Sequence, residues 1–228
     1  MSLASFLARR SFHYGLLVAG LTFLALLVAA GIRSAPGVLI VPLEKEFGWS
    51  RATISLAISV NLVLYGLIGP FAATVMERIG IRRTMVFALA LIALGFGLTT
   101  TMSASWQLVL LWGVVVGSGS GVIALVLGAI IVNRWFSEQR GLVLGVLTAS
   151  TATGQLVFLP MLASIVDRSG WRTAAFVLTG VALFIIPAIA LFMRDRPTDV
   201  GLRPFGDVRI GQAPNKGDSQ LSSVSVHQ

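Results

Sequence analysis

Six long apolar runs dominate the sequence and limit what the chain can fold into. Each is close to or longer than the roughly 20 residues that a helix needs to cross a bilayer. Hydrophobic residues make up 56% of the chain and charged residues 11%, which excludes a water-soluble globular domain, since such domains are roughly one-quarter charged. Lipid offers no partner for unpaired backbone groups, and the runs lack the alternation of barrel strands, so all six are expected to be transmembrane helices. They cover approximately residues 14–42, 52–76, 84–102, 106–133, 141–166 and 172–192.

Basic residues at the ends of the runs predict the orientation of the helices. With the amino terminus inside, seven arginines fall in inner segments and four basic residues in outer loops. Because cytoplasmic loops carry the excess of positive charge, this distribution predicts a cytoplasmic amino terminus. The inner residues are Arg9, Arg10, Arg78, Arg82, Arg83, Arg134 and Arg140, and the outer ones are Lys45, Arg51, Arg168 and Arg172.

The net charge of +8 does not indicate nucleic-acid binding. The basic residues stand singly or in pairs at the ends of the apolar runs, which is a membrane pattern, so nucleic acid is not an expected partner. Only two of the 17 basic residues are lysine. This scarcity suggests a GC-rich bacterial genome, and the bacterial plasma membrane is therefore the expected location.

Composition divides the chain into three parts. Residues 1–13 are expected to form a cytoplasmic amino terminus, and residues 14–194 a six-helix bundle. From Asp195 onward Asp, Arg, Pro, Gly, Ser and Gln predominate, which predicts that residues 195–228 form a solvated, disordered cytoplasmic tail. Six spans allow a 3+3 internal symmetry, but the residues alone reveal no repeat.

Residues suited to catalysis are missing from the apolar runs. Both histidines, His13 and His227, lie outside them, no H-E-x-x-H motif occurs, and the chain has no cysteine. Ser-His and zinc chemistry therefore have no residues to use within the runs, and no metal or other cofactor is expected. The sequence also has no Walker A motif. The chain is thus expected to be neither an enzyme nor driven directly by ATP.

The loop between the second and third runs carries a distinct pattern of charge and glycine. Residues 73–83 read Ala-Thr-Val-Met-Glu-Arg-Ile-Gly-Ile-Arg-Arg. This stretch resembles the inner-loop motif of the major facilitator superfamily, although alanine and valine at positions 73 and 75 replace a glycine and a leucine, and glutamate replaces the commoner aspartate. The matching residues are Glu77, Arg78, Gly80, Arg82 and Arg83.

Further short matches extend the resemblance over residues 14–205. Together they look like the branch of the superfamily that contains monocarboxylate transporters and oxalate:formate exchangers. The resemblance implies an all-α membrane fold: the amino-terminal six-helix half, built as a 3+3 inverted repeat, of a twelve-helix secondary transporter for a small organic anion. The matches are Asn133-Arg134-Trp135-Phe136, Arg140-Gly141, Gly145, Gly154, Pro160, Gly170-Trp171-Arg172, Arg194-Asp195-Arg196-Pro197 and Gly201-Leu202-Arg203-Pro204.

The same resemblance implies a latch and a partner. The inner loop of such transporters is taken to lock and release the two halves through charge pairs, and the alternative here is a positive-inside anchor with an incidental acid. The chain stops before any seventh run. The expected partner is therefore a missing carboxyl-terminal six-helix half, or else a second copy of the chain. A non-transporting membrane scaffold, or an inactive truncated fragment, remains the competing interpretation.

Arg33 is the most informative single residue. If one helix covers the whole first run, the guanidinium lies inside the membrane, where a charge costs several kcal/mol and usually serves function. The resemblance implies that it binds the substrate carboxylate, a group that a planar guanidinium fork matches. The alternative is that the helix ends at Arg33, which then extends to the outer interface while Pro36 starts an irregular exit.

Two polar stripes accompany Arg33 as expected substrate-binding positions. Asn61 and Tyr65 recur at helical spacing on the second run, and Thr148, Thr151 and Gln155 on the fifth. This pattern resembles the family plan in which helices one, two, four and five line the path. Hydrogen bonding between helices is the alternative role for each of these residues.

The fourth run carries a stripe of small residues. Gly113, Gly117 and Gly121 follow one another at intervals of four, which predicts close helix packing rather than substrate contact.

Overall fold

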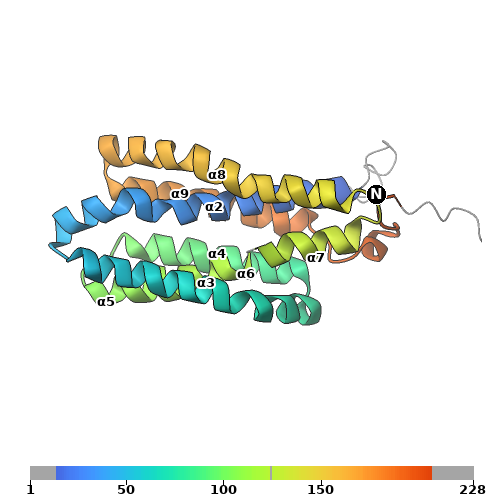
Figure 1. The fold of residues 1–228 in the computed structure, drawn as a ribbon, viewed down its shortest axis with the longest axis horizontal. Helices are drawn as coiled ribbons and strands as arrows, with labels where there is room; N and C mark the ends of the chain where they lie inside the picture. The colour runs from blue at the N-terminus through green and yellow to red at the C-terminus, as the bar shows by residue number, and fades with distance from the viewer. Residues whose placement is uncertain (1–13, 124, 207–228) are drawn as a thin grey trace, which may run out of the picture.

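The computed structural model describes residues 14–123 and 125–206, and these form an elongated bundle of helices that run along one axis (Figure 1). Six helical spans in the described part are long and apolar enough to cross a membrane. The expected and observed boundaries agree to within five residues. The spans are α2 (Tyr14–Phe47), α3 (Arg51–Ile79), α4 (Ile81–Thr99), the composite span Ser105–Trp135, α8 (Arg140–Ser169) and α9 (Trp171–Phe192).

The fourth span is built from several helical segments. It begins with α5 (Ser105–Leu108), continues through a π-helical stretch, η1 (Val109–Val116), and ends with α6 (Gly117–Val122) and α7 (Leu125–Trp135). In a π-helix the backbone hydrogen bonds join residues five apart instead of four, and such stretches often occur at functional sites. The π-helical stretch lines the hollow around Asn61 that is described below.

A single glycine joins α3 to α4, and another joins α8 to α9. Gly80 and Gly170 have φ values of +100° and +83°, a conformation that a residue with a Cβ rarely adopts. The surrounding hexapeptides share an acidic residue, an arginine, the glycine and a second arginine at the same positions. They read Glu-Arg-Ile-Gly-Ile-Arg at 77–82 and Asp-Arg-Ser-Gly-Trp-Arg at 167–172. This is the internal repeat that the sequence analysis missed.

Helix packing follows the same repeat. Helix α2 packs mainly against α8, α3 against η1 and α6, and α4 against α9. If spans one to three are exchanged in order with spans four to six, the pairing of α2 with α8 becomes the pairing of the fourth span with α3. The pairing of α4 with α9 stays the same. The bundle thus has the pairing that a 3+3 repeat requires.

Large apolar side chains cover much of the outer surface. Phe184 is 80% exposed, Leu156 76% and Phe71 66%. Such a surface is unfavourable in water and suited to lipid, or to a second apolar bundle. In the interior, Trp135, Phe96 and other apolar side chains are fully buried.

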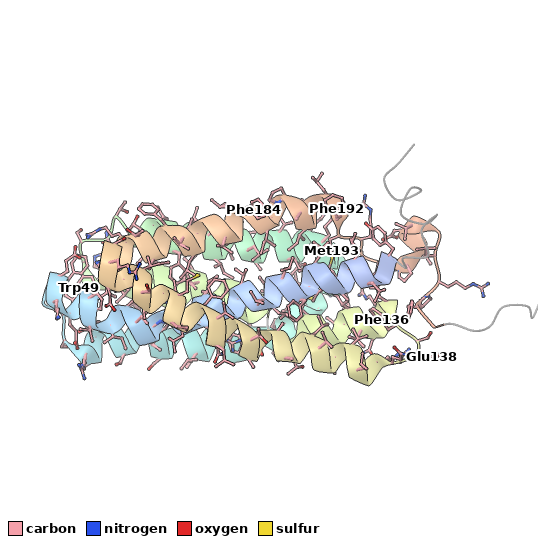
Figure 2. The ribbon with its side chains drawn as sticks, turned by 90° about the horizontal axis from the view of Figure 1, so that it is seen from above. Trp49, Phe136, Glu138, Phe184, Phe192 and Met193 are labelled. Atoms are coloured by element: carbon pink, nitrogen blue, oxygen red, sulfur yellow. The ribbon has the colours of Figure 1, made fainter. Side chains whose placement is uncertain are left out.

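Both ends of the bundle carry side-chain contacts between helices. One end, the Gly170 end (residues 47–51, 99–105 and 169–172), is held by Glu46, which accepts a hydrogen bond from Nε1 of Trp171 and forms an ion pair with Arg172 at 2.5 Å. Trp49, which is labelled near one tip of the bundle in Figure 2, stacks on Phe47 there.

The opposite end, the Gly80 end (residues 79–83, 136–139 and 193–206), is crossed by the segment after α9. Asp195 accepts a hydrogen bond from the backbone N–H of Arg82 at 2.8 Å. Phe205 forms an isolated β-bridge with Phe136, which is labelled at this end in Figure 2.

The segment after α9 differs from the sequence expectation. Residues 195–206 were expected in a disordered tail, but they include the 3₁₀-helix η2 (Pro197–Val200) and dock on the bundle through the Asp195 and Phe205 contacts. Backbone and carboxylate hydrogen bonds order this polar stretch without an apolar run. The expected cytoplasmic segment 1–13 and the remainder of the tail, 207–228, lie outside the described residues.

Candidate functional site

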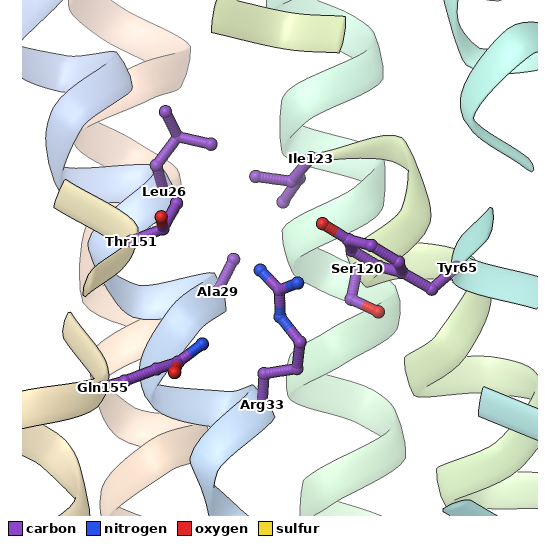
Figure 3. Close-up of a pocket in the computed structure, with 8 residues that line it drawn as sticks. All are labelled: Leu26, Ala29, Arg33, Tyr65, Ser120, Ile123, Thr151 and Gln155. Atoms are coloured by element: carbon purple, nitrogen blue, oxygen red, sulfur yellow. The ribbon is translucent and has the colours of Figure 1, made fainter. Parts of the chain in front are cut away.

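A cavity of about 120 Å³ lies between four of the six spans. A single water needs only about 10–15 Å³, so the cavity has room for a ligand of a few heavy atoms. Helices α2, α3 and α8 line it together with the fourth span, whereas α4 and α9 do not. Figure 3 shows the lining residues Leu26, Ala29, Arg33, Tyr65, Ser120, Ile123, Thr151 and Gln155.

Arg33 projects its guanidinium into the middle of this group (Figure 3). Its Cζ lies 4.4 Å from the centroid of the Tyr65 ring, a cation–π contact between α2 and α3. Its Nε is buried and has no hydrogen-bond partner among the described residues. The two ion pairs found in residues 14–123 and 125–206 join Arg51 to Glu44 and Arg172 to Glu46. No described carboxylate therefore neutralises Arg33.

An unneutralised cation inside a membrane bundle is costly. Insertion scales place the penalty for arginine at about 2.5–3.5 kcal/mol at the helix centre. The Tyr65 ring offsets part of this cost, at most about 2 kcal/mol. An anion in the cavity would offset the rest.

Helix α2 continues without a break past Arg33. It extends 14 residues further, to Phe47, and includes Pro36 and Pro42. At 1.5 Å per residue, Arg33 lies roughly 20 Å from the Phe47 end of the helix. The alternative in which the helix ends at Arg33 is therefore not the conformation observed.

Close contact between α2 and α8 brings Arg33 next to the polar residues of α8. A Cβ on Gly154 would lie 2.6 Å from the carbonyl oxygen of Leu27, and one on Gly31 would lie 2.5 Å from the Phe158 ring. The two glycines thus allow an approach that any larger residue would prevent.

The predicted glycine stripe lies against α3. A Cβ on Gly117 would lie 2.9 Å from the Cα of Asn61, and one on Gly121 would lie 3.1 Å from the Cα of Tyr65. A Cβ on Gly113 would lie 3.1 Å from the carbonyl oxygen of Ala57. The stripe brings the fourth span close to the α3 face that carries Tyr65.

Asn61 has a role between helices. Its Nδ2 donates a hydrogen bond of 2.8 Å to the carbonyl oxygen of Trp112 in the π-helical stretch. Asn61 also lines a second hollow of about 240 Å³, which Arg33 and Ser120 share with the first cavity.

The α8 stripe only partly reaches the cavity. Thr151 and Gln155 line it, and the Thr151 hydroxyl donates a hydrogen bond to the carbonyl oxygen of Thr148. Thr148 is exposed, and its own hydroxyl donates to the carbonyl oxygen of Leu144. The structure therefore brings four predicted residues to one cavity (Arg33, Tyr65, Thr151 and Gln155), places Asn61 in the adjoining hollow, and leaves Thr148 outside both.

Ser120 is a lining residue that the sequence analysis missed. It is buried, borders both hollows, and donates a hydrogen bond of 3.1 Å to the carbonyl oxygen of Gly117. A polar residue beside Gly121 in an apolar run could have indicated a lining position, but the sequence analysis considered only the glycines of that run.

The inner-loop motif lies at the Gly80 end. Glu77 and Arg78 are exposed at the end of α3, and Arg83 is exposed in the first turn of α4. Within the described residues Glu77 forms no ion pair. Over the same residues, no three His, Asp or Glu side chains gather as a metal site requires.

Comparison with known proteins identifies the family of this bundle. The profile of the Major Facilitator Superfamily matches residues 21–224. The chain belongs to the major facilitator superfamily. This assignment confirms the resemblance and the all-α membrane fold, and it makes the chain an integral membrane protein.

Relatives within the superfamily include carboxylate transporters. Human monocarboxylate transporter 14 is 28% identical over 183 residues, covering 80% of this chain and 35% of the relative. The oxalate:formate antiporter of Oxalobacter formigenes is 27% identical over 165 residues, covering 71% of this chain and 38% of the relative. A fujikurins efflux protein of Gibberella fujikuroi is 27% identical over 139 residues, covering 59% and 29%. The chain thus spans about a third of the length of these curated relatives.

Proposed function

We propose that this bundle is the amino-terminal half of a secondary transporter that moves a small organic anion, a monocarboxylate or similar, by alternating access. The observation that carries the proposal is Arg33, a half-buried cation whose Nε is fully buried and which has no carboxylate partner among the described residues, in a cavity lined by four spans. The relatives named for monocarboxylate and for oxalate and formate support the same substrate class.

Arg33 acts in this proposal as the ligand for the substrate carboxylate. A guanidinium presents parallel N–H groups that match the two carboxylate oxygens, and such charge-assisted pairs are about twice as strong as neutral hydrogen bonds. Binding would neutralise the buried charge, so the anion is favoured over an uncharged analogue of the same shape. Tyr65 holds the guanidinium from one side and leaves its other edges for the ligand.

Polar groups around Arg33 would complete the coordination of the ligand. Gln155 supplies amide donors, and the Thr151 and Ser120 hydroxyls line the same cavity from its two sides. Asn61 would act indirectly, because its amide holds the π-helical stretch in place through the carbonyl oxygen of Trp112. The Thr148 hydroxyl bonds to the α8 backbone, so in this proposal Thr148 does not contact the ligand.

Alternating access requires a second bundle. Transporters of this type bind substrate near the midplane between two repeats and rock one against the other. We propose that α3 and α8, with their largely exposed faces, meet such a carboxyl-terminal half, with a second copy of the chain as the alternative partner. Glu77 and the arginines of the inner loop would then form their latch contacts with that half. In this arrangement the Gly80 end faces the cytoplasm, together with both termini.

The experiment that tests this function is uptake of labelled small monocarboxylates into proteoliposomes. The vesicles would contain this chain alone, this chain with a matching carboxyl-terminal half, or no protein. We expect saturable uptake only with both halves, inhibited by unlabelled carboxylate and not by the corresponding uncharged amide. Equal inhibition by the amide would contradict the role of Arg33, and no uptake by the paired halves would leave the non-transporting scaffold as the function.

A further inference from the structure

A third hollow, with basic walls, lies at the Gly80 end, away from the Arg33 cavity. Its volume is about 350 Å³. Arg134 reaches it from the last turn of α7, and Arg196 and Thr198 reach it from the segment after α9. Two prolines, Pro197 and Pro204, form the rest of the lining.

The two arginines of this hollow have no acidic partner within the described residues. Both ion pairs of that part of the chain lie at the Gly170 end. The two acids nearest to Arg196 in sequence bind backbone instead: Asp199 accepts a hydrogen bond from the N–H of Arg196, and Asp195 accepts one from the N–H of Arg82. Glu138, the acid nearest to Arg134 in sequence, is exposed and forms no ion pair within the described residues. Two guanidinium groups therefore line one hollow without an ion pair to a described carboxylate.

The walls of the hollow are held in place from both sides. The N–H of Phe205 donates to the carbonyl oxygen of Trp135 at 2.7 Å, and the N–H of Ser137 donates to the carbonyl oxygen of Phe205 at 2.9 Å. The rings of Phe136 and Phe205 pack edge to face, 5.9 Å apart. These contacts fix Pro204 beside the end of α7, so the hollow is a built feature of this end of the bundle.

The geometry points to a binding site for the phosphate of an anionic phospholipid headgroup. Arg134 stands where the apolar fourth span ends, and the polar headgroup region begins at the ends of such spans. Guanidinium groups match phosphate oxygens in paired hydrogen bonds, and basic hollows beside the ends of transmembrane helices bind anionic headgroups. Thr198 adds a hydroxyl at the rim. A lipid is favoured over a soluble phosphate because the site adjoins the membrane-spanning surface.

Native mass spectrometry of the full chain in neutral detergent tests this site. Phosphatidylglycerol and phosphatidylcholine would be titrated separately into the wild type, Arg134→Gln, Arg196→Gln and the double variant. We expect selective retention of phosphatidylglycerol, with affinity falling about fivefold for each arginine removed. Arg83→Gln is the matched control, because it removes the same charge from an exposed position at the same end and should retain the lipid.

Each other result overturns the assignment in a distinct way. Equal retention of the two lipids would show attachment without headgroup selectivity, and an equal loss in Arg83→Gln would show general charge attraction; either result would exclude a specific site. Displacement of phosphatidylglycerol by millimolar inorganic phosphate would assign the hollow to a soluble phosphate. Because Arg196 is exposed, Arg196→Gln provides a variant that should fold even if the double variant does not. Wild-type lipid affinity in that variant would exclude Arg196 from the site.

Discussion

The Tyr65 ring lies against the guanidinium of Arg33, with 4.4 Å between the Arg33 Cζ and the ring centroid. The contact joins α3 to α2 across the cavity that we propose as the substrate site. It also positions the half-buried guanidinium that we propose binds the substrate carboxylate. Substitutions at Tyr65 therefore test how the site is organised.

Replacing Tyr65 by alanine should raise the KM for carboxylate uptake. A cation–π contact contributes about 0.5–2 kcal/mol, so the loss corresponds to a roughly two- to thirtyfold higher KM. Tyr65→Phe keeps the ring face and should stay within about twofold of the wild type. The measurement is the concentration dependence of uptake by the chain combined with its second half. Equal KM values for Tyr65→Ala and Tyr65→Phe would show that the ring does not organise Arg33.

Adding one methyl group at Gly154 should destabilise the bundle. A Cβ there would lie 2.6 Å from the carbonyl oxygen of Leu27, so α2 and α8 must separate, at a cost of about 1–3 kcal/mol. Gly145→Ala is the matched control on the same helix, since a Cβ at Gly145 meets nothing within 4 Å. Thermal unfolding in detergent should show a lower Tm for Gly154→Ala only. A Tm equal to that of Gly145→Ala would mean that the two helices do not pack this closely.

Cysteine labelling should place the two ends on opposite sides of the membrane. The chain contains no cysteine, so single substitutions can be labelled without background. Lys45→Cys and Ser169→Cys should react with an impermeant reagent in intact cells, whereas Glu138→Cys should react only after permeabilisation. All three side chains are exposed. The reverse pattern would invert the proposed orientation.

The chain on its own should insert into membranes but transport nothing. Gln155 and other polar groups at the exposed face of α8 would then meet lipid, which favours self-association. Light scattering after size-exclusion chromatography should show dimers or larger species. Co-expression with a carboxyl-terminal half should restore a single complex. Specific uptake by the chain alone would instead establish a homodimeric transporter.

The sequence predicted the six spans and the helices that line the cavity, because both depend on local patterns. Lipid forces each apolar run to satisfy its own backbone, so run length and helix length coincide. Of the predicted α8 stripe, Thr151 and Gln155 line the cavity and Thr148 does not. Thr148 stands about 10 Å along the helix from Gln155, beyond the reach of a small cavity.

Other features depend on contacts between distant segments. The pairing of Arg33 with Tyr65 requires the rotation of α2 relative to α3, which no local pattern determines. The ordering of residues 195–206 depends on Asp195 and Phe205 meeting the bundle at the Gly80 end, whereas their composition resembles that of a disordered tail. The hexapeptides around Gly80 and Gly170 carry the internal repeat in the sequence. Their equivalence becomes evident only in the structure, where each glycine alone connects two helices.

Uptake by Arg33 variants is the most direct test of the account. Proteoliposomes containing this chain and its second half would be assayed with a labelled monocarboxylate, with reconstituted protein quantified for each variant. We expect Arg33→Ala to lower uptake at least about a hundredfold, because it removes a bidentate charged pair, and Arg33→Lys to retain partial activity, because it keeps the charge without the planar fork. Uptake at the wild-type rate by Arg33→Ala would contradict the proposal that Arg33 binds the substrate carboxylate.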